Sequence, residues 1–284
     1  MAQYFTLPSA SLFSWPPTSA SEFIPPPKSG SIPYAPPFDI PGSVYQAWLR
    51  PEVPITIAAV YAVSAKLLNA YNKSTGKRPW AISKTRAFNI FVILHNVFLA
   101  VYSAWTCWGM FGALRRTMVN PMGPTGVNGM LDSMCRMSGP SGYGNGVVYD
   151  EATQTWNKYN PGVALSGNGQ PLSTDTGRLW NEGLAFYGWI FYLSKFYEVL
   201  DTLIILAKGK YSSTLQTYHH AGAMMCMWSG MRYMSPPIWI FVFVNSGIHA
   251  MMVSQHFTFA GMQNYTGSFS VRSDAPITAS AGCC

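Results

Sequence analysis

Residues 195–220 read K-F-Y-E-V-L-D-T-L-I-I-L-A-K-G-K-Y-S-S-T-L-Q-T-Y-H-H, and the rest of the predicted fold is organised around this stretch. Three ionisable side chains, Lys195, Glu198 and Asp201, lie inside a long apolar run, and a short basic turn separates it from a second apolar run. A charge at the centre of a membrane helix costs about 2.5 to 3.5 kcal/mol, so such groups persist where they face partners or water inside a bundle. The stretch therefore predicts membrane helices with a functional site between them.

The composition of the 284-residue chain is typical of a membrane protein. Hydrophobic residues make up 49% of the chain and charged residues only 10%, whereas soluble proteins carry roughly 25% charged residues. The net charge of +7 comes largely from Lys and Arg near the ends of apolar runs. We interpret this charge as a topology signal and expect no nucleic-acid partner.

Apolar runs of suitable length predict an all-α fold, a multi-pass transmembrane helix bundle of about five spans. The predicted spans cover residues 53–71, 87–112, 179–206, 215–231 and 237–253. The connection at residues 72–86 and the turn at 208–210 carry Lys and Arg without an acidic residue. The positive-inside rule assigns both to the cytosolic side of the membrane.

Three segments fall outside the helices of the predicted transmembrane domain, which covers residues 51–254. Residues 1–50 hold many of the 21 Pro and predict a disordered tail rather than a signal peptide. Residues 113–178 are rich in Gly, Asn, Ser and Pro and predict a loop insertion within the domain. Residues 255–284 are polar and aperiodic and predict a tail without a further span.

The polar residues of the last three spans form three helix faces. Lys195, Glu198 and Asp201 follow one another by three and form a slanted stripe. The polar residues of the other two spans recur at i, i+3 or i, i+4 and share a face within each span. They are Gln216, His219, His220, Asn245 and His249. All three faces lie toward the predicted cytosolic side, so we expect them to meet.

Neutral imidazoles in a half-dry pocket suit proton transfer or acyl capture, because a His with a pKa near neutrality serves as base or nucleophile. Carboxylates at Glu198 and Asp201 can fix tautomers or pair with Lys195. Two simpler interpretations stay open. In the first, Lys195 and Glu198 form only an internal ion pair that holds helices together. In the second, His95 in the second span is an ordinary residue of the helix bundle.

A metal site is the competing interpretation, because H-x-x-H-H boxes in membrane proteins often bind a pair of irons. The box here begins with Gln216, and the chain holds only five His, which are too few for a di-iron site. A single zinc held by His219, His220, His249 and a carboxylate has poor geometry, because two of its ligands are adjacent in sequence. We therefore predict no metal and no cofactor.

The motifs in residues 195–252 resemble the ELO-type fatty-acid elongases, the membrane 3-oxoacyl-CoA synthases, in a form most similar to fungal members. The family's K-x-x-E-x-x-D-T matches residues 195–202 in full, and its H-x-x-H-H appears at 216–220 with Gln in place of the first His. The family's N-x-x-x-H-x-x-M matches residues 245–252, and the L-H-N of residues 94–96 also resembles the family pattern. The family continues with two more spans, so the resemblance implies an incomplete version of a seven-span fold, truncated after the fifth span.

The resemblance implies fatty-acid elongation in the endoplasmic reticulum membrane. Acyl-CoA and malonyl-CoA condense to 3-oxoacyl-CoA, with release of carbon dioxide and CoA. His219 takes the acyl group with His249 as its partner, and His220 orients or deprotonates. The residues expected to stabilise charge or contact substrate are Lys195, Glu198, Asp201, Gln216 and Asn245.

The expected partners are the two CoA thioesters, membrane lipid, and other elongation enzymes or a second copy of the chain. The alternatives are a catalytically inactive elongase that acts as a membrane partner, or a small transporter that uses the same polar cavity. An enzyme requires the histidines, whereas transport depends on the carboxylates Glu198 and Asp201.

Overall fold

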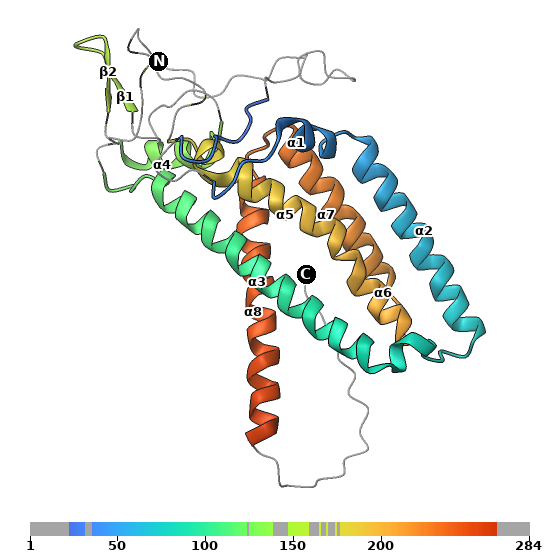
Figure 1. Ribbon diagram of the computed structural model, residues 1–284. Coiled ribbons are helices and arrows are strands. Elements are labelled where there is room, and N and C mark those ends of the chain that lie inside the picture. Colours follow the sequence, from blue (N-terminus) through green and yellow to red (C-terminus); the bar gives the residue numbers. More distant parts are fainter. Residues whose placement is uncertain are drawn as a thin grey trace.

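The computed structural model describes residues 23–31, 36–123, 125–138, 147–158, 165, 169, 174 and 177–265. The predicted all-α class is confirmed, because helices account for nearly all regular structure of the described residues (Figure 1). The α-helices are α1 (Gly42–Trp48), α2 (Glu52–Ser74), α3 (Arg86–Thr117), α4 (Gly126–Cys135), α5 (Ala185–Tyr197), α6 (Val199–Ala207), α7 (Thr214–Arg232) and α8 (Ile238–Tyr265). The other elements are the 3₁₀-helix η2 (Ala81–Lys84), the π-helix η3 (Trp180–Leu184) and an antiparallel hairpin of β1 (Val147–Asp150) and β2 (Thr155–Lys158).

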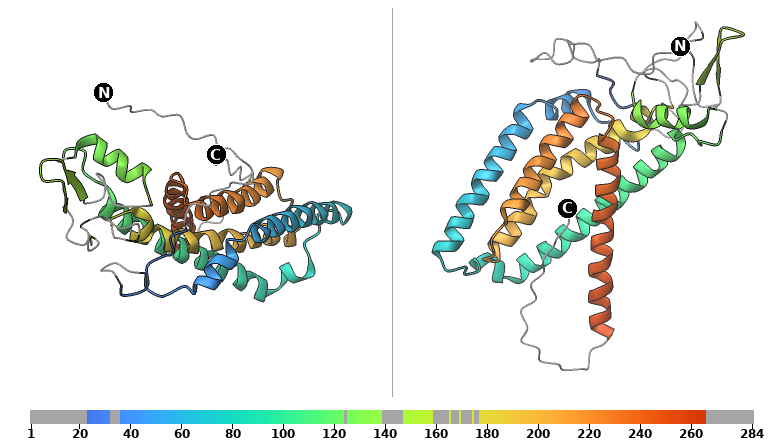
Figure 2. Two further views of the ribbon diagram at one scale, coloured as in Figure 1. Left: turned by 90° about the horizontal axis from the view of Figure 1, so that it is seen from above. Right: turned by 180° about the vertical axis from the view of Figure 1, so that it is seen from behind.

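The helices form a bundle, and the last part of α8 extends away from the other helices (Figures 1 and 2). Helices α2 and α7 and the α5–α6 pair lie side by side, while α3 runs beside them and α8 packs across α3 (Figures 1 and 2). Among the described helices, α2 and α3 are long and apolar enough to cross a membrane. Their large exposed apolar side chains include Val60, Val63, Leu67, Leu94 and Val101.

The third predicted span is not one helix. The apolar run at residues 179–206 divides into η3, α5 and α6, and Glu198 lies at the break between the last two. Its N–H still donates to the Ser194 carbonyl at 2.8 Å, whereas the N–H of Asp201 donates to the Glu198 carbonyl at 3.1 Å, a tighter i to i+3 pattern. The sequence hides this break because the apolar residues run through it without a Pro or Gly.

The amino-terminal segment caps one end of the bundle. Tyr45 in α1 is 1% exposed, and its ring stacks on Trp189 at 5.2 Å between centroids. Backbone carbonyls of this segment accept hydrogen bonds from aromatic side chains of the bundle. These bonds join Trp180 to Ile24, Tyr192 to Trp48 and Trp228 to Leu49.

The prediction of a disordered tail over residues 1–50 is therefore wrong for residues 23–31 and 36–50. The abundant Pro suggested disorder, but the aromatic residues between them bury against α5 and supply a packing energy that the composition does not reveal. Residues 1–22 lie outside the described part of the chain.

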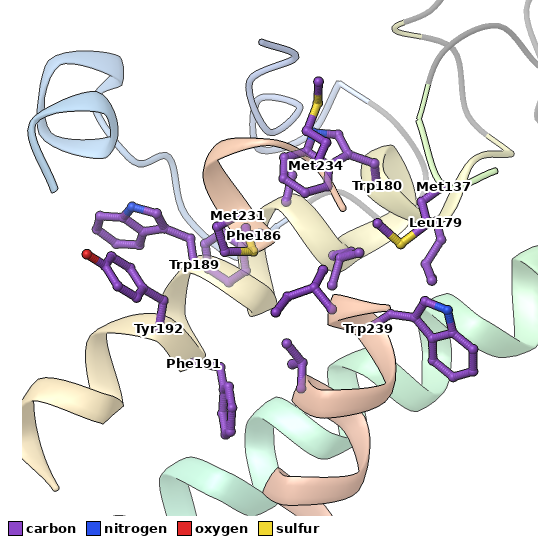
Figure 3. Close-up of a cluster of buried hydrophobic side chains, with 14 of the residues drawn as sticks. Met137, Leu179, Trp180, Phe186, Trp189, Phe191, Tyr192, Met231, Met234 and Trp239 are labelled. Carbon is purple, nitrogen blue, oxygen red and sulfur yellow. The ribbon is translucent and has the colours of Figure 1, made fainter. Parts of the chain in front are cut away.

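The main hydrophobic core lies under this segment and is rich in aromatic and Met side chains, with aliphatic residues such as Leu179 between them (Figure 3). It also recruits residues from the region predicted as a loop insertion, since Met137 is buried there and the Trp239 indole donates to the Met134 carbonyl at 3.2 Å. The region at 113–178 therefore contains α4, the β1–β2 hairpin and core contacts, besides residues that are not described.

Helix α8 continues to Tyr265, beyond the predicted end of the fifth span at residue 253. No Pro interrupts residues 254–265, and Phe257, Phe259 and Met262 lie among them. The polar residues in this segment suggested a tail, but they are compatible with a helix that leaves the bundle. Residues 266–284 lie outside the described part of the chain.

Candidate functional site

A buried lysine forms the centre of the candidate site. The Lys195 ammonium donates to the Glu198 carboxylate at 2.6 Å and to the Asn245 side-chain oxygen at 2.9 Å. Lys195 is 1% exposed and Glu198 3%. Lys195 thus links the end of α5 to α8, because Asn245 lies in the first half of α8.

The local fold explains why this lysine is tolerated in an apolar bundle. The i, i+3 spacing brings Glu198 onto the same side of the helix as Lys195, and the Phe191 ring lies one turn earlier with its centroid 3.9 Å from the ammonium. Desolvation of both charges is costly, and the short ion pair with its additional Asn245 acceptor offsets that cost.

His220 lies on the other side of Glu198, on α7. Its Nδ1 is 3.8 Å from Glu198 Oε2, too far for a hydrogen bond. Both atoms are buried, and neither has a hydrogen-bond partner among the described residues. The Tyr61 ring from α2 meets the His220 ring edge to face at 6.1 Å between centroids. A small movement that closes the 3.8 Å gap gives His220 a carboxylate partner.

His219 and His249 occupy different surroundings from His220. His219 is exposed on α7, with its ring centroid 5.6 Å from that of His220. His249 is partly buried on α8 and interacts electrostatically with Glu198. His249 also interacts electrostatically with His219, and the expected partnership of these two residues stays a prediction.

Asp201, the third member of the polar stripe, has its hydrogen-bond partner on α3. It accepts a 2.7 Å hydrogen bond from His95 Nε2 of α3, and it also interacts electrostatically with Lys195. The interpretation of His95 as an ordinary bundle residue missed this contact. The signal that pointed to it was the L-H-N of residues 94–96, which resembles the family pattern.

Gln216 belongs to a third polar group. Its amide donates to the Thr202 hydroxyl at 3.4 Å, and the same hydroxyl lies 2.9 Å from the Tyr61 hydroxyl. An apolar cavity of about 280 Å³ lies between α2 and α6, with Tyr61 and Thr202 in its wall. Gln216 therefore ties α7 to the α2–α6 contact, a hydrogen-bonding role that needs no titration.

The described residues contain no group of three or more His, Cys, Asp or Glu side chains arranged to hold a metal ion. What they do hold is a buried ammonium–carboxylate pair with a neighbouring buried imidazole and an exposed one. Such a set can stabilise developing negative charge, shuttle a proton and offer a nucleophilic nitrogen.

Comparison with known proteins places the chain in a family context. Residues 47–270 match the family described as ELO: GNS1/SUR4, so the matched region runs beyond the domain end predicted at residue 254. A putative fatty acid elongase of Dictyostelium discoideum is 39% identical over 80 residues, which cover 28% of this chain and 27% of the relative. Fatty acid elongase 2 of Trypanosoma brucei brucei is 31% identical over 78 residues, covering 28% and 29%.

Very long chain fatty acid elongase 3 of Homo sapiens is 30% identical over 76 residues, covering 27% of this chain and 28% of the relative. The chain thus aligns with less than a third of the length of each of these relatives. No solved structure matches it.

Proposed function

The chain belongs to the ELO (GNS1/SUR4) family, and from that membership we propose that it elongates fatty acids by condensing acyl-CoA with malonyl-CoA. In this proposal it is a multi-pass protein of the endoplasmic reticulum membrane. The basic residues of the α2–α3 connection and of the α6–α7 turn face the cytosol, where both CoA thioesters are available. In this proposal, the condensation reaction needs neither a metal nor a cofactor.

One observation carries the proposal more than any other. Inside an apolar helical body, the Lys195–Glu198–Asn245 cluster brings a cation and a carboxylate beside His220, with His219 one residue away and exposed. Buried charge of this kind in a membrane protein marks a functional site. Its elements are also the ones that carry the family-like motifs.

The reaction divides into two transfers. In the first, a neutral imidazole nitrogen of His219 attacks the acyl-CoA carbonyl, the carbon–sulfur bond breaks, and CoA leaves with the imidazole proton. In the second, malonyl-CoA loses carbon dioxide, and the electron pair of the broken carbon–carbon bond attacks the acyl carbon. The carbon–nitrogen bond then breaks, and the imidazole regains a proton, so one proton is consumed overall.

The other residues take supporting roles in this scheme. Lys195 offsets the negative charge that develops as malonyl-CoA loses carbon dioxide, since its ammonium is fixed by Glu198 and Asn245. His220 transfers protons with Glu198 as its carboxylate partner, and His249 assists from α8. Gln216 and Asp201 keep α7 and α6 in place.

The covalent step predicts a burst that needs no malonyl-CoA. Incubation with acyl-CoA alone should release about one equivalent of CoA per active protein, because acyl-histidine accumulates when its acceptor is missing. His219→Ala should abolish the burst, and Tyr218→Phe, a change in the exposed neighbouring residue, should retain it. A burst of equal size in His219→Ala would assign the nucleophile to another residue.

A further inference from the structure

Glu198 is the single residue between α5 and α6, and His95 contacts a residue on each side of it. On the α5 side, the His95 ring lies 5.1 Å from the ring of Tyr197, the last residue of that helix. On the α6 side, His95 Nε2 lies 2.7 Å from the Asp201 carboxylate. One side chain of α3 therefore contacts the chain on both sides of Glu198.

His95 is itself held firmly. It is 1% exposed, and its ring stacks on Phe91 of the same helix at 6.0 Å between centroids. Because a carboxylate only accepts hydrogen bonds, the imidazole donates its Nε2–H to Asp201. A hydrogen bond to a charged acceptor is about twice as strong as a neutral one. Helix α6 packs mainly against α2, and this bond joins it to α3.

We propose that His95 is a positioning residue that holds the break through Asp201 and so keeps Glu198 directed at Lys195 and His220. The kinetic consequence rests on the proposed elongation reaction, whereas the structural consequence does not. Without the bond, α6 is free to shift relative to α5, and the buried His220 loses the fixed carboxylate beside it.

Three variants separate the hydrogen bond from the ring. His95→Phe keeps an aromatic ring between Phe91 and Tyr197 but removes the donor. His95→Gln supplies an amide donor toward Asp201 without the ring. Leu94→Ala is the matched control, because this neighbouring side chain is 61% exposed on the same helix.

The first readout needs no turnover. Diethyl pyrocarbonate modifies neutral imidazoles, and mass spectrometry gives the rate at each histidine of the full chain in membranes. Exposed His219 serves as the internal reference for buried His220. In His95→Phe, we expect the His220 to His219 rate ratio to rise about tenfold, as local opening becomes easier without the bond. His95→Gln and Leu94→Ala should keep the ratio within about twofold of the wild type.

Each other outcome overturns the proposal. An unchanged ratio in His95→Phe would show that the bond does not hold the break. A rise of equal size in His95→Gln would assign the effect to ring packing. Faster modification of His219, His220 and His249 together would show a general loss of structure.

The second readout is kinetic. If the wild type forms 3-oxoacyl-CoA, His95→Phe should lower kcat about tenfold with little change in KM for malonyl-CoA, and His95→Gln should recover most of the loss. A wild type without product would contradict the proposed reaction alone, and the modification ratio would still decide the role of His95.

Discussion

Replacing Glu198 with Ala is expected to destabilise the folded protein by about 3 to 5 kcal/mol, because it leaves the Lys195 ammonium buried without its counter-charge. Lys195 is 1% exposed and donates its shortest hydrogen bond, 2.6 Å, to this carboxylate. Asn245 alone cannot neutralise the charge. The measurement is the unfolding free energy of the detergent-solubilised protein, together with its yield in membranes.

The matched control removes both charges at once. The double variant Lys195→Met with Glu198→Leu should recover most of the lost stability, because replacing a buried ion pair by apolar residues of similar volume is often neutral or stabilising. It should nevertheless make no elongation product. A double variant as unstable as Glu198→Ala would show that the bundle requires the ion pair for its stability. Apolar residues of similar volume could then not replace it.

Gly209→Ala is expected to loosen the end of the bundle where α6 turns into α7. Gly209 has a φ of +74°, and an added Cβ would lie 2.4 Å from the Lys77 carbonyl oxygen of the α2–α3 connection. The left-handed conformation costs a non-glycine residue about 1 to 2 kcal/mol. The clash adds an overpacking cost of about 1 to 3 kcal/mol, since the neighbouring atoms belong to backbone.

Gly76→Ala separates these two costs. Gly76 has a similar φ of +66°, but no atom lies within 4 Å of its added Cβ. It should therefore show only the conformational cost, and thermal unfolding of both variants gives the difference. Equal destabilisation by the two substitutions would mean that the α6–α7 turn does not press against the α2–α3 connection.

The sequence predicted the helical class and the approximate position of each bundle helix, because long apolar runs and basic turns carry that information directly. It did not predict the break at Glu198. The polar contacts that flank this break, Lys195 with Asn245 and Asp201 with His95, join it to helices that lie far away in the sequence. Periodicity within one segment cannot contain them.

The amino-terminal segment shows the same limit in another form. Its Pro content predicted disorder, yet Tyr45 is part of the core. Its burial depends on aromatic donors such as Trp180 and Trp228, more than 130 residues later in the chain. The spacing of polar residues predicted that the polar faces of α5, α7 and α8 meet, but not that Asp201 would have its hydrogen-bond partner on α3.

The most direct test of the proposed function is malonyl-CoA-dependent formation of 3-oxoacyl-CoA by the 284-residue chain in isolated membranes, with His219→Ala beside it at equal protein. We expect product from the wild type and a loss of at least about a hundredfold in the variant. Product at equal rates from both proteins, or none from a stably inserted wild type, would contradict it.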